Sequence, residues 1–168
     1  MYKKKLIVLC ITLLLASCTS LDFVYKNNDH KIPIVYKTKY QVVGEDAEVL
    51  NSFLQKNLGS PEEGVFFDLF VDSSKKIDAA VIDKDATASK FNIIYSIFYN
   101  LKDSNRGCVI IQKTITTKTS YKTKSAGYSF GTDISEKEVS AKSIESNVNQ
   151  FFNSLIISNK NLTCNNAN

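Results

Sequence analysis

The stretch FNIIYSIFYNLKDSNRGCVIIQKTITTKTSY, residues 91–121, decides the fold. Its first part places Phe91 and every second residue onward to Leu101 on one face, which is typical of a β-strand. Residues 102–107 have the composition of a turn, and residues 108–121 return as a second long strand that is rich in threonine. A short connection between two long alternating runs predicts an antiparallel pair.

A further strand and a helix are predicted near the start of the domain. Residues 34–43 alternate with a period of two and are expected to form a strand. A short helix should follow, because Asp46 is a suitable N-cap and apolar residues recur at helical spacing as far as Leu58. Gly59 is well suited to end this helix.

The remaining segments complete the predicted elements. Residues 65–72 alternate as another strand, and residues 73–88 are expected to be an extended hairpin or a flexible loop. Residues 122–133 are predicted to be a polar connection that carries aromatic residues. Residues 135–138, Ser-Glu-Lys-Glu, have the form of a capping box and predict the start of a helix of about 20 residues. Its apolar face consists of Ile144, Val148, Phe151, Phe152 and Leu155.

Two amphipathic helices and four strands, each with one apolar face, predict an α+β fold. We expect a two-layer sandwich in which the two helices pack on one face of a four-stranded mixed sheet. The first strand–helix–strand unit can be a parallel crossover, whereas the later strands are antiparallel. The other face of the sheet carries Thr, Lys, Gln and Asn with some aromatic residues, so it tolerates a polar partner.

The first 17 residues are predicted to be a secretion signal. Three lysines stand in residues 1–5, and an almost wholly apolar segment follows at residues 6–16. Residues 15–18, Leu-Ala-Ser-Cys, have the form of a bacterial lipobox, in which small residues precede a cysteine that accepts a diacylglycerol. An ordinary signal with a chance cysteine is the alternative. Thr19 follows Cys18 where an inner-membrane retention signal has Asp, which favours the outer membrane.

The predicted organisation leaves two cysteines in the mature domain. Cys108 and Cys164 lie in a compartment that permits disulfides, and the sequence leaves open whether they pair. The chain divides into a lipoprotein signal at residues 1–17, a lipidated tether at 18–31, a single domain at 32–157 and a C-terminal tail at 158–168 that we expect to be flexible.

Composition excludes several classes of function. Cleavage before Cys18 removes three lysines and lowers the net charge from +4 to +1, so the charge gives no case for nucleic-acid binding. A single histidine, His30, rules out a histidine-cluster metal site, and we expect no metal or cofactor beyond the lipid on Cys18. The sequence contains no P-loop, HExxH or GxSxG motif and no nucleophile–base pair. We therefore expect a protein that is not an enzyme.

Basic side chains gather along the last predicted strand and just beyond it. Lys118, Lys122 and Lys124 have the same parity and would lie on one side of an extended chain, with Arg106 at the other end of the strand. One interpretation is a solvated strand end. The other is a cationic strip that binds a phosphorylated lipid through charge-assisted hydrogen bonds.

Residues 15–157 resemble the lipopolysaccharide-assembly lipoprotein family LptE. The resemblance rests on the order and spacing of several motifs. The first are the lipobox, an aromatic lead-in at residues 23–25 and the helix that ends at Leu58. The strand at 91–101, the threonine-rich run at 116–121 that continues into residues 125–129, and an acidic helix follow. The resemblance implies the same two-helix, four-strand fold. It also implies a protein that plugs the lumen of the large outer-membrane barrel LptD, assists its assembly and binds lipopolysaccharide on its way to the cell surface.

The resemblance also suggests roles for individual residues. Lipopolysaccharide binding is expected at Lys118, Lys122, Lys124 and Arg106, and contact with the LptD-like barrel at Tyr121, Tyr128 and Phe130. The alternative is a structural lipoprotein of the envelope that braces another outer-membrane assembly without binding lipid.

Overall fold

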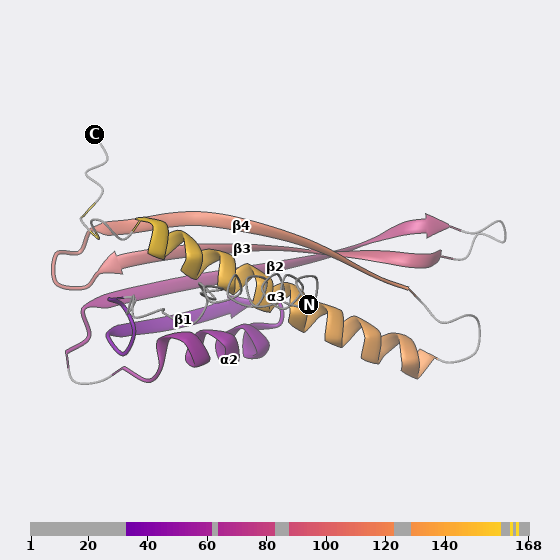
Figure 1. Ribbon diagram of the computed structural model, residues 1–168, viewed down its shortest axis with the longest axis horizontal. Coiled ribbons are helices and arrows are strands. Elements are labelled where there is room, and N and C mark those ends of the chain that lie inside the picture. Colours follow the sequence, from indigo (N-terminus) through magenta and orange to yellow (C-terminus); the bar gives the residue numbers. More distant parts are fainter. Residues whose placement is uncertain are drawn as a thin grey trace, which may run out of the picture. The chain divides into compact units, whose positions relative to one another are not determined.

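The computed structural model describes residues 33–61, 64–82, 88–122, 129–158, 162 and 164, with the backbone alone at 88, 129–132 and 158. In this part of the chain, four strands form one sheet and two helices pack on it, which is the predicted α+β architecture (Figure 1). The elements are β1 (Thr38–Gly44), α2 (Ala47–Leu58), β2 (Phe67–Ile82), β3 (Ala88–Asp103), β4 (Val109–Lys122) and α3 (Ser129–Ser158).

The sheet has the strand order β1-β2-β3-β4 and is mixed, as predicted. β1 runs parallel to β2, with Thr38 beside Phe67, whereas β2 and β4 both run antiparallel to β3. A parallel pair needs a crossover connection, and α2 provides it here. The predicted crossover is therefore confirmed.

The apolar core lies between the helices and one face of the sheet. Every second residue of β3 from Ile93 to Leu101 is fully buried, as the alternation predicts. The rings of Tyr99 and Phe151 stack with their centroids 4.2 Å apart, which joins β3 to α3. The helices contribute their predicted apolar faces: Leu50, Leu54 and Leu58 from α2, and Ile144, Val148, Phe151, Phe152 and Leu155 from α3.

β1 begins at Thr38, later than the alternation from residue 34 predicts. Residues 33–37 form a turn instead, and the hydroxyl of Thr38 donates a 2.7 Å hydrogen bond to the carbonyl of Ile34. This turn directs the side chain of Ile34 into the core, where it is fully buried. Tertiary packing has overridden a local strand preference.

β2 and β3 form the extended hairpin that was one of the two alternatives for residues 73–88. β2 continues to Ile82, although its later half mixes charged and small residues. The partner strand explains this length, because Ser73 pairs with Ile97 and Ala79 with Phe91 along the strongly alternating β3. Cross-strand pairing thus extends a strand whose own sequence favours it only weakly.

α3 begins before the capping box. The sequence predicts a start at residues 135–138 and a non-helical connection before it, but the helix starts at Ser129 and includes residues 129–133. Both expectations are wrong at this point. The carboxylate of Glu136 contacts side chains of β2 and β4, so tertiary contacts support turns of helix that the local signal does not predict.

Cys108 and Cys164 form a disulfide, a pairing that the sequence alone leaves open. The two Cα atoms lie 5.6 Å apart, a usual separation for such a bond. Leu162 also packs against the apolar core. Two positions within the predicted tail are therefore attached to the domain, while most of the other tail residues lie outside the described part of the chain.

Asn147 is a fully buried polar residue in the middle of the core face of α3. Its carbonyl oxygen accepts a 2.9 Å hydrogen bond from the hydroxyl of Tyr99, and its amide donates to the carbonyl of Ile115 at 2.8 Å. Burial raises the pKa of the Tyr99 phenol, so this hydroxyl stays protonated and needs an acceptor. Asn147 therefore fixes the register between α3, β3 and β4.

Replacing Asn147 by Ala should lower the free energy of unfolding by about 3 kcal/mol, because two buried polar groups lose their partner. The exposed Asn149 is a matched control two residues further along α3, and Asn149→Ala should change stability by less than about 0.5 kcal/mol. Urea unfolding followed by circular dichroism measures both variants. Equal effects of the two substitutions would contradict the assigned role of Asn147.

Candidate functional site

The outer face of the sheet, opposite α2 and α3, is polar, and no element of the described chain covers it (Figure 1). Ser74, Ser96 and Thr116 form one row across three strands. The hydroxyl of Ser74 donates to the carbonyl of Ser96 at 3.1 Å, and the hydroxyls of Ser96 and Thr116 are 3.1 Å apart. The hydroxyls of such a row can also bond to water or to a polar partner.

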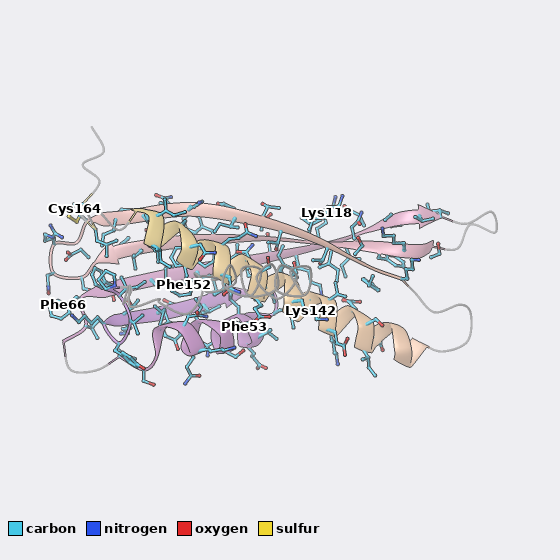
Figure 2. All side chains as sticks on the ribbon, viewed as in Figure 1. Phe53, Phe66, Lys118, Lys142, Phe152 and Cys164 are labelled. Atoms are coloured by element: carbon cyan, nitrogen blue, oxygen red, sulfur yellow. A yellow bond between two sulfur atoms is a disulfide. The ribbon has the colours of Figure 1, made fainter. Side chains whose placement is uncertain are left out.

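One half of this outer face carries four lysines, of which Figure 2 labels Lys118. Lys118 pairs with Ile94, and Ile94 pairs with Lys76, so two lysines stand in one cross-strand row. Lys122 pairs with Lys90 further along the same face. Lys76 forms an ion pair, with its Nζ 3.0 Å from the carboxylate of Asp78. We call Lys76, Lys90, Lys118 and Lys122 the lysine patch.

Two of the predicted lysines thus lie together, and the strand register adds two that the prediction missed. Lys90 precedes Ile94 by four positions and therefore lies on the same face of β3, so the alternation of the strand could have predicted its place. Lys76 lies in the segment of β2 without clear alternation, and no local pattern marks it. Lys124, Tyr128 and the side chain of Phe130 lie outside the described residues, as does Cys18.

Arg106 lies apart from the lysine patch, in the turn between β3 and β4. Lys118 is twelve positions further along the chain, about 40 Å if the chain is extended. Its guanidinium is 2.8 Å from the carboxylate of Asp103, and its backbone N–H donates to the same side chain at 2.8 Å. These bonds lower the pKa of Asp103. Arg106 therefore stabilises its turn and does not share a binding strip with Lys118.

Tyr121 faces α3, so the expected barrel contact at this residue is corrected. Its side chain is only 8% exposed, and its ring stacks on Phe91 with the centroids 5.6 Å apart. The hydroxyl donates to Glu136 at 3.2 Å. Tyr121 joins β4 to α3 and leaves almost no surface for another protein.

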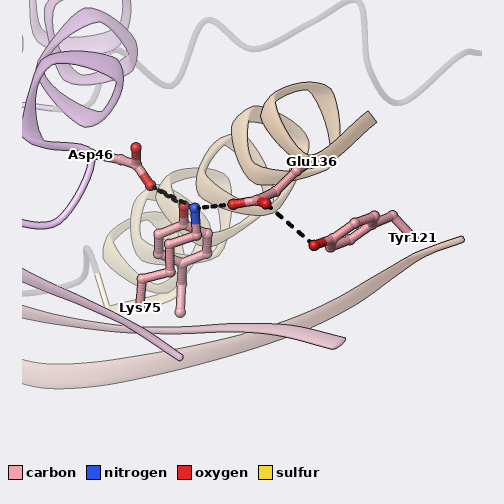
Figure 3. Close-up of polar contacts among 5 residues, drawn as sticks. Asp46, Lys75, Tyr121 and Glu136 are labelled. Atoms are coloured by element: carbon pink, nitrogen blue, oxygen red, sulfur yellow. Dashed lines mark hydrogen bonds and ion pairs between the residues drawn. The ribbon is translucent and has the colours of Figure 1, made fainter. Parts of the chain in front are cut away.

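A polar cluster links five elements between the sheet and the helices (Figure 3). The ammonium of Lys75 lies 2.9 Å from the Glu136 carboxylate and 3.5 Å from that of Asp46. The hydroxyl of Tyr95 donates to Asp46, and that of Tyr121 donates to Glu136. We call these five residues the Lys75 cluster. It joins the start of α2 to β2, β3, β4 and α3.

Asp46 stands at the predicted N-cap position of α2 but does not cap the helix. Its backbone is left-handed, with φ 52° and ψ 32°, and its side chain makes no capping hydrogen bond. The carboxylate binds Tyr95 and Lys75 instead. The position was predicted correctly and the chemistry was not, because the long-range partners of Asp46 were invisible in the local sequence.

The pKa values of the Lys75 cluster indicate that it stabilises the fold and does not transfer protons. Burial alone would lower the pKa of Lys75, but its hydrogen bond to Glu136 and its charged neighbours outweigh burial and raise the pKa to about 12. Burial, together with the bond to Asp46, raises the pKa of Tyr95 to about 12. Burial and Glu136 also raise the pKa of Tyr121. At neutral pH the cluster holds a charged lysine and neutral phenols, which does not suit proton transfer.

Within the described ranges, no group of three or more His, Cys, Asp or Glu side chains could hold a metal ion. No helix in the same ranges has both the length and the apolar character needed to cross a membrane. The lysine patch on the open sheet face is therefore the best candidate site.

Several solved structures share this fold. A protein of Caulobacter crescentus CB15 that is provisionally named a lipoprotein matches with a TM-score of 0.56 and 13% identity, over 75% of this chain and 93% of its own. A minor lipoprotein from Acinetobacter baumannii matches with a TM-score of 0.55 and 16% identity, over 76% and 96%. Rare lipoprotein B from Shewanella oneidensis matches with a TM-score of 0.52 and 10% identity, over 73% and 97%.

The sequence itself matches no protein-family model and no curated protein sequence. At these identities the structural likeness shows the fold alone. This α+β sandwich is thus a fold that bacterial lipoproteins adopt.

Replacing Lys75 by Met should lower the free energy of unfolding by about 1–2 kcal/mol at pH 8, because two carboxylates lose their shared partner. The folded-state pKa of Lys75, about 12, exceeds the ordinary 10.5, so its stabilisation is complete below pH 10.5 and is lost as the pH rises toward 12. The stability difference between the variant and the unmodified protein should therefore shrink at pH 11.

The neighbouring Lys76 provides the control, since its side chain is 72% exposed on the opposite face. Lys76→Met should cost less than about 0.5 kcal/mol at both pH values. Urea unfolding at pH 8 and pH 11 measures all three proteins. The role of Lys75 would be refuted by a cost no larger than that of Lys76→Met, or by one that does not change with pH.

Proposed function

We propose that this chain is an outer-membrane lipoprotein that plugs the lumen of an LptD-like β-barrel, helps that barrel to assemble and binds lipopolysaccharide during its delivery to the cell surface. A lipid on Cys18 anchors it on the periplasmic side of the membrane. It is not an enzyme and works without a metal or cofactor. The lysine patch on an uncovered sheet face is the observation that carries this proposal.

The lysine patch has the chemistry that a phosphorylated lipid requires. Lys76 and Lys118 stand two strands apart, about 10 Å, and Lys118 and Lys122 are about 13 Å apart along β4. Ammonium groups over such a span can donate charge-assisted hydrogen bonds to more than one phosphate of the same headgroup. Ile94 lies between Lys76 and Lys118 in the same row and offers an apolar contact.

The rest of the outer face fits a water-filled lumen. Its hydroxyl row of Ser74, Ser96 and Thr116 bonds internally, so polar side chains of a barrel wall can approach without a desolvation penalty from orphaned groups. The expected mature net charge of +1 limits repulsion on insertion. An anchor in the same membrane raises the local concentration of the plug at its barrel. The shared lipoprotein fold supports the anchored state.

Reversing the charge of Lys118, Lys122 and Lys124 together with glutamate should weaken lipopolysaccharide binding roughly tenfold or more, because attraction to phosphate becomes repulsion. The remaining binding should also depend less on salt. Surface plasmon resonance on immobilised lipopolysaccharide, at low and physiological ionic strength, measures both effects.

A variant with the same change of charge on the helical layer is the control. Lys56, Lys137 and Lys142 are exposed on α2 and α3, and Figure 2 labels Lys142 on α3. Replacing these three lysines with glutamate should leave binding within about twofold of the unmodified protein. If both triple variants lose affinity equally, general charge and not the lysine patch drives binding.

Affinity purification of the mature lipoprotein from detergent-solubilised outer membrane should recover a large β-barrel protein in stoichiometric amount. Depleting the lipoprotein should then lower the amount of folded barrel, since the plug assists assembly. Recovery with a different envelope assembly, and no loss of any barrel, would favour the structural lipoprotein that braces another complex without binding lipid.

A further inference from the structure

The end of the domain opposite the lysine patch exposes aromatic rings among basic side chains. Tyr36 is 53% and Phe66 is 43% exposed, and the ammonium of Lys37 lies 5.6 Å from the centre of the Phe66 ring. Figure 2 shows Phe66 at one end of the sheet and Lys118 toward the other. The exposed Lys102 and Arg106 belong to the Phe66 end. We call Tyr36, Lys37, Phe66, Lys102 and Arg106 the aromatic end.

The backbone bonds around the aromatic end hold its rings in place. Tyr36 donates its N–H to the carbonyl of Leu58 at 2.7 Å while adopting a φ of 60°, which is uncommon outside glycine. Its ring rests on Gly59, where any side chain would collide with it. Phe66 donates its N–H to the carbonyl of Lys37 at 3.0 Å and accepts a 2.9 Å bond from the N–H of Ser104. The two rings are thus presented on a fixed framework.

We infer that the aromatic end docks on the anionic headgroup region of the membrane in which the lipid on Cys18 is inserted. This inference rests on the proposed lipidation of Cys18. The described domain begins at Pro33, the first residue of the turn that holds Tyr36, and Pro33 is 15 positions after Cys18 in the sequence. A chain of that length spans at most about 50 Å, so the tether ends at the aromatic end and keeps it within reach of the bilayer.

The composition of the aromatic end matches an interfacial contact. Tyrosine and phenylalanine rings partition into the headgroup region, where an apolar ring and a polar edge are both satisfied. Lys37 and Lys102 add attraction to anionic lipids near the surface, whereas the charge of Arg106 is balanced by Asp103. The ammonium of Lys37 sits over the Phe66 ring, so one headgroup can contact both the charge and the ring.

Docking in this way would orient the whole domain. The row of β3 that pairs with Phe67 lies nine residues from the row of Ile94, about 30 Å along the strand. With the aromatic end on the bilayer surface, the lysine patch is held far from that surface. It is then clear of the anchoring headgroups and can meet a lipid in transit.

The absence of tryptophan from the chain allows a direct test. Phe66→Trp adds a single fluorophore at the aromatic end, and Ile94→Trp adds one on the outer face of β3 beside Lys118. The purified lipid-anchored protein is reconstituted in phosphatidylcholine–phosphatidylglycerol vesicles whose acyl chains carry bromine. Emission from residue 66 should fall about twofold relative to unbrominated vesicles, while emission from residue 94 should stay unchanged. Equal quenching at both positions, or none at residue 66, would overturn the docking.

A second reporter and two serine variants complete the test. Tyr36→Trp is a second reporter should Phe66→Trp fail to fold, and it should be quenched in the same way. Phe66→Ser should weaken the quenching of that reporter roughly tenfold in apparent partitioning, whereas Ile82→Ser, at a residue that is 65% exposed elsewhere, should not. Equal effects of the two serine variants would count against the aromatic end as the membrane contact.

Mass spectrometry of the same samples separates this inference from the proposed function. A lipidated Cys18 with an unquenched residue 66 refutes the docking and leaves the anchored plug intact. An unmodified Cys18 removes the proposed anchor and with it the premise of the docking. A lipidated Cys18 with quenching restricted to residues 36 and 66 supports both.

Discussion

The architecture depends on the burial of a single face of the sheet. In β3, side chains from Ile93 to Leu101 alternate between fully buried and partly exposed positions. Because the period is two, no residue can change face without shifting the register of the whole strand. Both helices pack on the buried face, and their apolar side chains complete one core with it. The opposite face carries mainly polar and charged residues, with a few apolar ones such as Phe70 and Ile94. This asymmetry leaves that face available to the proposed partner.

The Lys75 cluster lies where apolar alternation on the inner face of β2 gives way to charge. Leu69 and Val71 are buried there, but Lys75 occupies an inner position two rows further along. A lysine under two helices needs partners, since an unpaired charge in that place costs several kcal/mol. Asp46, at the start of α2, and Glu136, on α3, supply them. Tyr95 donates to the same Asp46 oxygen that Lys75 contacts, whereas Tyr121 donates to the second oxygen of Glu136. The cluster therefore determines how the starts of α2 and α3 meet the sheet, which apolar packing alone would leave less specific.

Local patterns predicted the elements well and the contacts between them poorly. The strands follow from alternation and the helical faces from helical spacing. Along β3 from Ile93 to Leu101, the residues that the alternation assigns to the inner face are the ones that are buried. Asp46 and the capping box of α3 have the composition of helix caps, yet the carboxylates of Asp46 and Glu136 are bound by residues on other elements. The sequence predicts that Lys118 and Lys122 share a face with Lys124, but only the strand register adds Lys76 and Lys90. Local sequence thus specifies which face a residue occupies, whereas its neighbours across strands depend on register.

The two ends of the domain differ in the chemistry they expose, and this difference would matter for a protein held by the proposed lipid on Cys18. The 14 residues between Cys18 and Pro33 would limit how far the domain can lie from the bilayer, but their length alone would not fix its orientation. The lysine patch could then face the anchoring bilayer, where anionic headgroups would compete with any lipid in transit for the same ammonium groups. The inferred second contact at the aromatic end would remove that freedom, because the patch lies about 30 Å away along paired strands. Rigid burial of one sheet face is what transmits the orientation from one end to the other, since a loosely packed hairpin would bend instead of holding the patch clear of the surface.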